Sequence, residues 1–594
     1  MPRFTFPWQQ EVCKKCGKPL LTLATRRRQV VSLTYGRFLA IDVEGFCPRH
    51  RKLPPARSPE LPRIVAPGCK LAYDLIAKVG MERFVECRQC EEIQLGLSRQ
   101  YGIELPVKTI SYLSQKFVAY FQVVHQESIG LLRGDMCKRG GYILHIDGTC
   151  EEASHVLLIC FDSLSEQVLE SCKISSENTG EVRKVLQGVR RDWGVPLAIV
   201  HDLRKSLIAA AAEVFHGVPQ FVCHYHLAAD VGKDLLSPHV DRLRCLFRRT
   251  KVRSKLGALC RSLKEFAVSP ASGEHVLTCV MGLNSCQKLR EYSTPEIAKG
   301  AVHSLASWIL ASSRSGEGYG FPFDLPYLKL HQRILTTHQV LVEAITDWSM
   351  KNRGALGSLK RFKQILDTVV EGEYAEEFHG IVTETKRLKI FLLRTALRIC
   401  PKDGKKRRND EGAPSTLSPN RHKALLQTLQ ESLARQSRRD PASDKACNVV
   451  TKHLKKYWDL LFGHVIKRKS QTIVVPRTNN IEERLFRTIK RQCRRPHGRG
   501  HLSRDLDAMS AGTALVLNLR NTSYCETVYG GAEPGRIAAR FSTVDPKIPV
   551  KLMEDWRRER LSKRIPRKFE RIDDLPQKLS RYLSMISREL NQGG

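Results

Sequence analysis

Apolar residues between Gly141 and Asp202 follow two different patterns, one typical of strands and one typical of a helix. Short apolar runs bounded by Asp, Ser and Gly and rich in β-branched residues are typical of strands, and we expect such strands at 141–149, 155–161 and 167–174. In 179–193 apolar residues return every three or four positions, which predicts a helix. A further apolar run, 196–201, ends the segment. The predicted order is therefore β-β-β-α-β.

Two carboxylates stand at the ends of these predicted strands. Asp147 ends the first strand and Asp202 follows the fourth. Strand ends present polar groups to ligands, so neighbouring strands would bring the two acids together. Carboxylates in a partly dry pocket repel each other, and a divalent cation such as Mg²⁺ removes that repulsion. Asp is also common in turns, which explains either residue alone, but the pair favours a metal site.

The chain beyond Asp202 is mostly helical in pattern. An Ala-rich helix over 203–215 and a strand over 219–223 precede a Cys-x-x-His pair, Cys223 and His226. That pair has no second half nearby, so a packed thiol beside a hydrogen-bonded histidine is favoured over a metal site. Helical patterning then continues to about Ser470, which predicts a large helical insertion.

A basic helix is predicted within 476–500. Asn479 or Asn480 is the expected N-cap, with acids in the first turn and bases later. The residues that share one face of this helix by their spacing are Glu483, Arg487, Lys490 and Arg494. A carboxylate aligned with bases suits a metal ligand beside a nucleic-acid backbone. A solvated face of ion pairs explains the same pattern, and the pattern alone does not decide.

The N-terminal segment carries a set of metal ligands. Cys13 and Cys16 are followed by Cys47 and His50, which supply four tetrahedral ligands for structural zinc, with Gly17 in the tight turn. The alternative is four unrelated groups in a Cys-rich protein. A second Cys-x-x-Cys pair, at positions 87 and 90, lies in a helical pattern and is interpreted as buried thiols.

Two helices joined by a short turn are predicted after a stiff Pro-rich linker. They cover 84–100 and 107–121, which is the outline of a helix-turn-helix. In such modules the second helix enters the major groove, which makes Lys108 and Lys116, with the serines at 111 and 114, candidate DNA contacts. An ordinary helical hairpin fits equally well.

Charge indicates the class of partner. The 594 residues include 98 Lys plus Arg against 61 Asp plus Glu, a formal net charge of +37. A positive charge of this size favours nucleic acid as the binding partner. A membrane is disfavoured, because no apolar run approaches the roughly 20 residues that span a bilayer. With no signal peptide at the N-terminus, we expect a cytoplasmic protein whose cysteines are thiols or metal ligands.

Three motifs in order resemble the DDE transposases of bacterial insertion sequences and the related Mutator-like elements. They are His-Ile-Asp147-Gly-Thr, Val-His-Asp202-Leu with Cys223-His-Tyr-His226, and Thr-Asn-Asn-Ile-Glu-Glu483-Arg-Leu-Phe-Arg-Thr-Ile-Lys490. The resemblance covers roughly 141–500. It implies a ribonuclease-H-like core with Asp147, Asp202 and Glu483 as the metal-binding triad. The family pattern of Asn three residues before Glu and a base seven after favours Glu483 over its neighbour at 482.

The resemblance also implies an activity. Two Mg²⁺ (or Mn²⁺) ions would support cleavage of transposon ends and transfer of the 3′-hydroxyl into target DNA. The partners would be double-stranded DNA and at least one further copy of the chain, in a bacterial cytoplasm close to the nucleoid. Cys223 and His226 would support the site. The basic side chains expected to neutralise phosphates are Arg487, Lys490, Arg491, Arg494 and Arg495. A catalytically inactive DNA-binding descendant and a nuclease without strand transfer are the alternatives.

The expected fold class is multidomain α/β plus α, a ribonuclease-H-like mixed sheet interrupted by an all-helical insertion. The expected segments are a zinc knuckle (1–62), a helix-turn-helix region (63–135), the first part of the core (136–230), the insertion (231–473), the last part of the core (474–530) and a basic C-terminal tail (531–594). The tail, most basic from Val550 to Gly594, departs from the family pattern.

Overall fold

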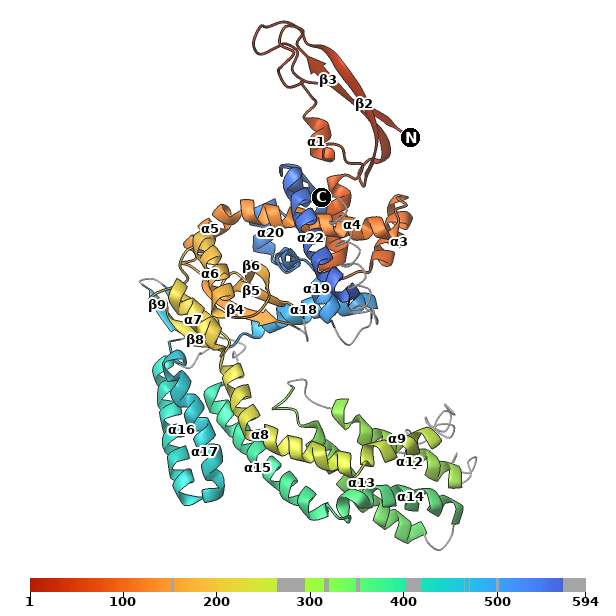
Figure 1. Cartoon of the computed structure of the whole chain (residues 1–594), viewed down its shortest axis with the longest axis vertical. Helices are drawn as coiled ribbons and strands as arrows, with labels where there is room; N and C mark the ends of the chain where they lie inside the picture. The colour runs from red at the N-terminus through yellow and green to blue at the C-terminus, as the bar shows by residue number, and fades with distance from the viewer. Residues whose placement is uncertain are drawn as a thin grey trace, which may run out of the picture. The chain divides into compact units, whose positions relative to one another are not determined.

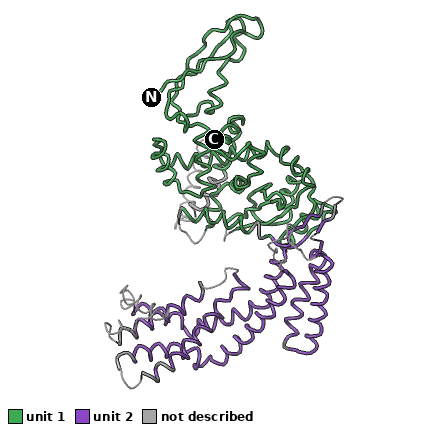
Figure 2. The backbone as a smooth tube through the Cα atoms, turned by 180° about the vertical axis from the view of Figure 1, so that it is seen from behind, with its two compact units in different colours: residues 1–220, 479–594 green, residues 221–478 purple. Residues whose placement is uncertain are grey.

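The computed structural model divides the chain into two compact units. Unit 1 comprises Met1–Gln220 and Asn479–Gly594, and unit 2 comprises Phe221–Thr478 (Figure 2). The residues that the structure describes are 1–150, 154–263, 294–314, 320–348, 353–401, 418–463, 465–468, 471–497 and 502–569. Both ends of the chain therefore contribute to unit 1, and the predicted insertion, 231–473, lies within unit 2.

A small sheet forms the N-terminal part of unit 1. Its strands, in the order β1-β3-β2, are β1 (Arg3–Phe6), β2 (Leu21–Ser32) and β3 (Gly36–Phe46). Strand β1 runs parallel to β3, and β2 runs antiparallel to it. The sheet packs on a small core that includes Val30, Phe38 and Leu61. A core of this size gives limited stability, which is why small modules commonly need a metal or disulfide.

Helices follow this sheet along the chain. They are α1 (Glu60–Ile64), α2 (Tyr73–Gly80), the π-helical turn η1 (Met81–Val85), α3 (Cys90–Tyr101), α4 (Val107–Glu127) and α5 (Ile129–Lys138). Helix α3 begins with a capping box between Gln89 and Glu92 and ends at Gly102, whose φ of 61° few other residues adopt. The two predicted helices are confirmed, although the first begins six residues later than expected because of this cap.

A five-stranded mixed sheet lies at the centre of unit 1. Its strands are β4 (Ile143–Thr149), β5 (Val156–Asp162), β6 (Gln167–Ile174), β7 (Ala198–His201) and β8 (Gln220–Val222), in the order β6-β5-β4-β7-β8. The first three strands are antiparallel neighbours, and β7 runs parallel to β4. The parallel step requires a crossover, which α6 (Thr179–Trp193) provides. Helix α7 (Lys205–Val214) packs on α6. The predicted β-β-β-α-β order is confirmed.

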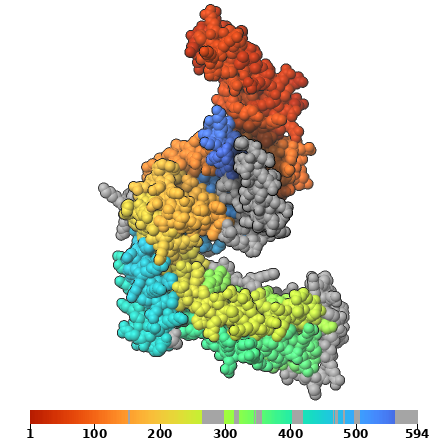
Figure 3. Space-filling view, viewed as in Figure 1, coloured from red at the N-terminus to blue at the C-terminus, as the bar shows by residue number. Residues whose placement is uncertain are grey.

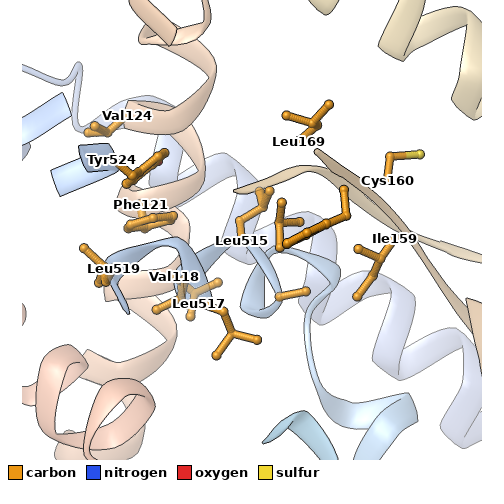
Figure 4. Close-up of a cluster of buried hydrophobic side chains, with 14 of the residues drawn as sticks. Val118, Phe121, Val124, Ile159, Cys160, Leu169, Leu515, Leu517, Leu519 and Tyr524 are labelled. Carbon is orange, nitrogen blue, oxygen red and sulfur yellow. The ribbon is translucent and has the colours of Figure 1, made fainter. Parts of the chain in front are cut away.

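The segment after the insertion completes the core of unit 1. It contains α18 (Asn480–His497), α19 (Ser503–Ala508), η5 (Ala511–Thr513), η6 (Leu515–Arg520), α20 (Thr522–Tyr529), α21 (Pro534–Phe541) and α22 (Lys547–Phe569). Figure 4 shows Leu515 and Tyr524 beside Phe121 of α4 and Leu169 of β6, all in one hydrophobic cluster.

The interpretation of 531–594 as a tail needs correction. Ile537 and Phe541 of α21 are fully buried in the core of unit 1, and α22 packs against α4. The basic composition of the segment concealed this role, although the buried residues Ile537, Phe541 and Val544 recur at helical spacing. Residues 570–594 of the expected tail lie outside the described residues.

Unit 2 consists mainly of helices. They are α8 (His224–Arg249), α9 (Val252–Ser262), α12 (Thr294–Leu310), η3 (Ala311–Arg314), α13 (Pro326–Trp348), α14 (Arg353–Val370), α15 (Ala375–Ile399), α16 (Pro419–Arg439), α17 (Pro441–Tyr457) and η4 (Trp458–Leu460). Helices α8 and α15 run alongside each other (Figure 1, Figure 3). Among the described residues, none of the helices combines the length and apolar character needed to cross a membrane.

An antiparallel hairpin ends unit 2, where only helical pattern was expected. Its strands are β9 (Val465–Arg468) and β10 (Gln471–Val474). Both contain β-branched residues, which favour a pleated conformation, but each covers only four residues. Four residues are too few to show the alternation of apolar and polar positions that identifies a strand.

Candidate active site

Strand register brings the first two predicted acids together. Parallel strands β4 and β7 pair from Ile143 opposite Ala198 to Ile146 opposite His201. Asp147 and Asp202 each follow the last of these pairs, so both lie at the same end of the sheet. Asp147 is buried, with 8% of its surface exposed. The side chain of Asp202 is 21% exposed. The two carboxylates therefore share a partly dry environment.

Glu483 reaches this environment from α18. It lies in the first turn of that helix, where its backbone N–H donates to the carbonyl of Asn479. Phe486 and Ile489 pack this helix against the core of unit 1, where both are buried. Leu485 is partly buried against the same core. These apolar residues of α18 therefore pack on unit 1, whereas Arg487 and Arg491 are exposed.

A buried hydrogen bond joins the strand of Asp147 to the start of the helix that carries Glu483. His145 points to the same face of β4 as Asp147, because the two positions are two residues apart. The Nδ1 of His145 donates to the Oδ1 of Asn479 at 3.2 Å, and both residues are buried. Burial lowers the pKa of His145 to about 4, so the imidazole is neutral near pH 7. Sequence reasoning missed this contact.

The charges of Asp202 and Glu483 both act on the carboxylate of Asp147. The pKa of Asp147 is raised to about 7, first by burial, then by the charge of Asp202 and, to a smaller extent, by that of Glu483. The backbone N–H of Gly148 and the guanidinium of Arg204 act in the opposite direction. Three carboxylates from distant segments of the chain thus converge at one end of the sheet.

The donor set fits hard divalent cations. Carboxylate oxygens are the ligands that Mg²⁺ and Mn²⁺ prefer, and a cation would stabilise the ionised form of the buried Asp147. Within the described part of the chain, the oxygens of the three acids do not form a closed group in which all pairs lie within 4.8 Å. The three acids therefore share a donor type that suits divalent ions without forming a closed ligand group. Asp147, Asp202 and Glu483 are the residues that would hold them.

The basic side of α18 lies beside Glu483. The guanidinium of Arg487 is 3.3 Å from the Glu483 carboxylate, and its side chain is 72% exposed. Arg491 and Arg494 are exposed, and Lys490 is partly exposed. Arg495 is exposed too, but its guanidinium contacts Glu92 of α3 at 3.3 Å. The first of these pairs is the i,i+4 ion pair that the sequence left as an alternative to nucleic-acid binding.

The predicted recognition helix, α4, is buried over most of its length beyond Tyr112. Lys116 is 3% exposed, and its ammonium lies 3.5 Å from the sulfur of Cys69. Ser114 is also buried and donates to the carbonyl of Ile110. Neither side chain can reach DNA from these positions, so both are withdrawn as contacts. Lys108, in the first turn of α4, is exposed. The three-to-four spacing of polar residues concealed the burial, because α4 is covered on several sides.

The N-terminal ligands form a compact group. The ligand atoms of Cys13, Cys16, Cys47 and His50 all lie within 4.8 Å of one another. The Cys16 and Cys47 sulfurs are 3.6 Å apart, and the Nδ1 of His50 is 3.6 Å from the Cys13 sulfur. A zinc tetrahedron has edges of about 3.8 Å between sulfurs and about 3.6 Å between sulfur and nitrogen. These residues can therefore hold zinc.

The local backbone prepares this group for a metal. Gly17, at a φ of 66°, turns the chain so that its N–H donates to the carbonyl of Cys13. The pKa of Cys13 is lowered to about 6, chiefly by the backbone N–H of Lys15. A lowered pKa favours the thiolate, which is the form that binds zinc. The role predicted for Gly17 is confirmed.

The remaining cysteine candidates occupy other places. Cys223 is buried at the N-cap of α8 and His226 is in the first turn of that helix, both in unit 2. Cys87 and Cys90 are half-buried rather than buried. Burial raises the pKa of Cys90, which keeps it a thiol. Within the described residues, none of these four belongs to a group of three or more ligands.

No protein-family model matches this chain, and no curated protein matches it.

Proposed function

We propose that this protein is a DDE transposase that cleaves the ends of its element and joins the freed 3′-hydroxyl to target DNA. The observation that carries the proposal is the electrostatic coupling of Asp147 to Asp202 and Glu483, three acids placed by two parallel strands and a helix. The sheet order β6-β5-β4-β7-β8, with three antiparallel strands followed by a crossover, supports a ribonuclease-H-like core.

In the proposed reaction, an in-line displacement at a phosphodiester, the acids and the His145–Asn479 pair have different roles. When bound, two Mg²⁺ ions would activate the attacking oxygen and stabilise the leaving oxygen. Asp147, Asp202 and Glu483 would hold the ions, and the buried hydrogen bond between His145 and Asn479 joins the strand of Asp147 to the start of the helix that carries Glu483. Oxygen attacks phosphorus and the bond from phosphorus to the 3′-oxygen breaks, first with water and then with the new 3′-hydroxyl as nucleophile. The protein forms no covalent bond in this scheme.

Basic residues supply the contacts to the DNA backbone. Lys490, Arg491 and Arg494 follow Glu483 along α18 and can neutralise phosphates next to the acids. Arg487 can do the same once its carboxylate partner holds a metal. The zinc group would keep the N-terminal sheet folded as part of an end-binding region. Joining two DNA ends requires at least two copies of the chain.

The triad is tested by Asp147→Asn in the full-length protein. We expect Mg²⁺-dependent cleavage of DNA carrying the repeats that flank the coding sequence to fall by roughly a hundredfold or more, because a direct ligand matters at least as much as its outer-shell partners. The control is Asp192→Asn, a carboxylate on α6 whose 24% exposure is close to that of Asp202. Cleavage at the wild-type rate by Asp147→Asn would refute the proposed site.

The reaction products distinguish the transposase from the two alternative functions. A DNA-binding descendant without activity gives a shifted DNA band and no cut strand. A nuclease without strand transfer gives cut ends that never join to a second duplex. Joined products that disappear together with cleavage in Glu483→Gln support the transposase, because both steps then depend on one site.

A further inference from the structure

The N-terminal sheet has two faces of different chemistry. Side chains on a strand alternate between the two faces, and the strand residues that belong to the small core all have even numbers, namely Phe6, Val30, Phe38 and Ala40. The register pairs odd-numbered residues of β1 and of β2 with odd-numbered residues of β3, up to the irregularity between Thr22 and Ala24. The odd-numbered residues therefore lie on the opposite face, which we call the outer face.

The outer face presents eight side chains in three rows across the strands. The register places Arg3, Leu39 and Gln29 in the first row, Thr5, Ile41 and Arg27 in the second, and Val43 and Thr25 in the third. The residues on β1 and β2 are exposed, whereas those on β3 are half-buried. A line of aliphatic side chains on β3 is thus flanked by basic and hydrogen-bonding groups on its two neighbours, of which β2 runs beside β3 in Figure 1.

The acids of the three strands lie on the core face. They are Asp42 and Glu44, both even-numbered residues of β3. Glu44 is buried and pairs with Arg26 at 3.1 Å and with Arg57 at 2.9 Å. The arginines at positions 3 and 27 of the outer face form no ion pair with any residue that the structure describes. The outer face therefore carries positive charge that is available to an anionic partner.

We propose that the outer face of the N-terminal sheet binds duplex DNA at the ends of the element, with Arg3 and Arg27 on phosphates and Gln29 at base edges. This inference rests on the proposed function, which makes element-end DNA the substrate, and it names the surface that recognises this DNA. The major groove accepts β-strands as well as a helix, and a glutamine can form two hydrogen bonds with adenine there. Helix α4 does not offer such a surface, because Lys116 and Ser114 are buried.

The width of the sheet matches the width of the major groove. Strand β3 lies between β1 and β2, and neighbouring strands are about 4.8 Å apart, so the backbones at Arg3 and Arg27 are separated by about 10 Å. The major groove of duplex DNA is about 12 Å wide. The two arginines can therefore reach phosphates on opposite sides of the groove, while Gln29 and the aliphatic line of β3 lie over the bases.

The experiment measures binding of the full-length protein to two fluorescent duplexes without Mg²⁺, so that no strand is cut. One duplex carries the repeats that flank the coding sequence, and the other is a scrambled duplex of the same length and composition. Wild type should prefer the first. Arg27→Gln should lower the slope of log K against log salt by roughly 0.9 on both duplexes, because one phosphate contact is lost. Gln29→Ala should reduce the preference for the first duplex by about tenfold, because a base contact is lost.

Arg26→Gln is the matched control, because Arg26 precedes Arg27 in β2 but lies on the core face with 68% of its side chain exposed. It should keep the wild-type slope and preference, since Arg57 still pairs with Glu44. Equal losses in Arg26→Gln and Arg27→Gln would overturn the inference, because net charge alone would then explain both. Should Arg27→Gln fail to fold, Gln29→Ala decides, because an unchanged preference there also overturns it.

Two further outcomes would contradict the proposed surface. The first is a wild-type protein that binds both duplexes equally, since no end recognition would then exist. The second is tighter binding to either single strand than to the duplex, because the partner would then be single-stranded nucleic acid.

Failure of the inference and failure of the proposed function give different results. If Asp147→Asn leaves cleavage intact while Arg27→Gln and Gln29→Ala change binding as expected, the proposed active site is wrong and the DNA-binding face stands. If Asp147→Asn abolishes cleavage while Arg27→Gln and Gln29→Ala bind both duplexes as wild type does, the active site stands and the inference is wrong.

Discussion

The His125 imidazole illustrates how one buried side chain links segments that are far apart in the sequence. Its Nδ1 accepts from the hydroxyl of Tyr524 at 2.9 Å, and its Nε2 donates to the carbonyl of Leu169 at 3.1 Å. Burial lowers its pKa to about 4, so the ring is neutral in the folded protein near pH 7. The neutral ring of His125 therefore forms hydrogen bonds with both β6 and α20.

His125 should make the stability of unit 1 depend on pH. The unfolded chain binds a proton with a pKa near 6.5, whereas the folded chain binds it only near 4. Stability is therefore complete above pH 6.5 and is lost as the pH falls toward 4. At pH 5.5 the loss from this group is roughly 1.4 kcal/mol. Urea unfolding at pH 7.5 and 5.5 measures it, and His125→Gln should lose less stability between these pH values than wild type.

The matched control for this prediction is His216→Gln, since His216 is exposed. It should show the wild-type loss of stability on acidification. An identical loss in wild type and His125→Gln would mean that other groups, such as the buried His331 of unit 2, account for the pH dependence.

Residues that act through long-range contacts could not be predicted from the sequence. Asp147 and Asp202 were found because each ends an apolar run, a signal that is local. The hydrogen bond from His145 to Asn479 spans 334 positions, and no periodicity encodes it.

At the scale of elements, sequence pattern succeeded where burial was simple. Strands β4, β5 and β6 are apolar runs with clear ends, and the structure confirms them within two residues. The pattern failed for α4, which is covered on several sides, so polar residues such as Lys116 and Ser114 are buried among apolar ones. Only the ends of α4 carry exposed residues, among them Lys108, so the spacing of its polar residues does not mark one exposed face.

The N-terminal sheet should depend on its metal. We expect the wild-type protein to carry about one tightly bound zinc ion per chain and Cys13→Ser to carry almost none, because three ligands hold zinc far less tightly than four. The metal content of the purified protein measures this. Cys13→Ser should also be cut faster by protease within the first fifty residues, because the small core around Phe38 then lacks the bound zinc that stabilises it.

Cys137→Ser is the control for the zinc prediction, because Cys137 is an exposed cysteine of α5. It should retain the metal and the wild-type protease pattern. A zinc content that Cys13→Ser leaves unchanged would rule out the proposed ligand set.

At the scale of the whole molecule, the formal net charge of +37 bears on the proposed binding to DNA. Affinity should fall steeply with salt, because each neutralised phosphate releases counter-ions. Replacing both Arg491 and Arg494 by Gln should lower the slope of log K against log salt by roughly 1.8. Binding to a fluorescent duplex at several salt concentrations measures the slope.

A control arginine tests whether that change is local to α18. Arg242 lies on α8 in unit 2, is 63% exposed and pairs with Glu377. Arg242→Gln removes the same kind of charge and should leave the slope unchanged. Equal effects of the two substitutions would indicate a general influence of net charge in place of contacts by α18.

The division of unit 1 around unit 2 has a consequence for synthesis of the protein. A ribosome that has just finished unit 2 has released β4 and β7 with Asp147 and Asp202, but neither α18 nor the residues that cover Phe121 and Leu169. Until Phe541 has been translated, the hydrophobic core stays open to water. We therefore expect a chain that ends inside the insertion to lack both Glu483 and the residues that complete this core.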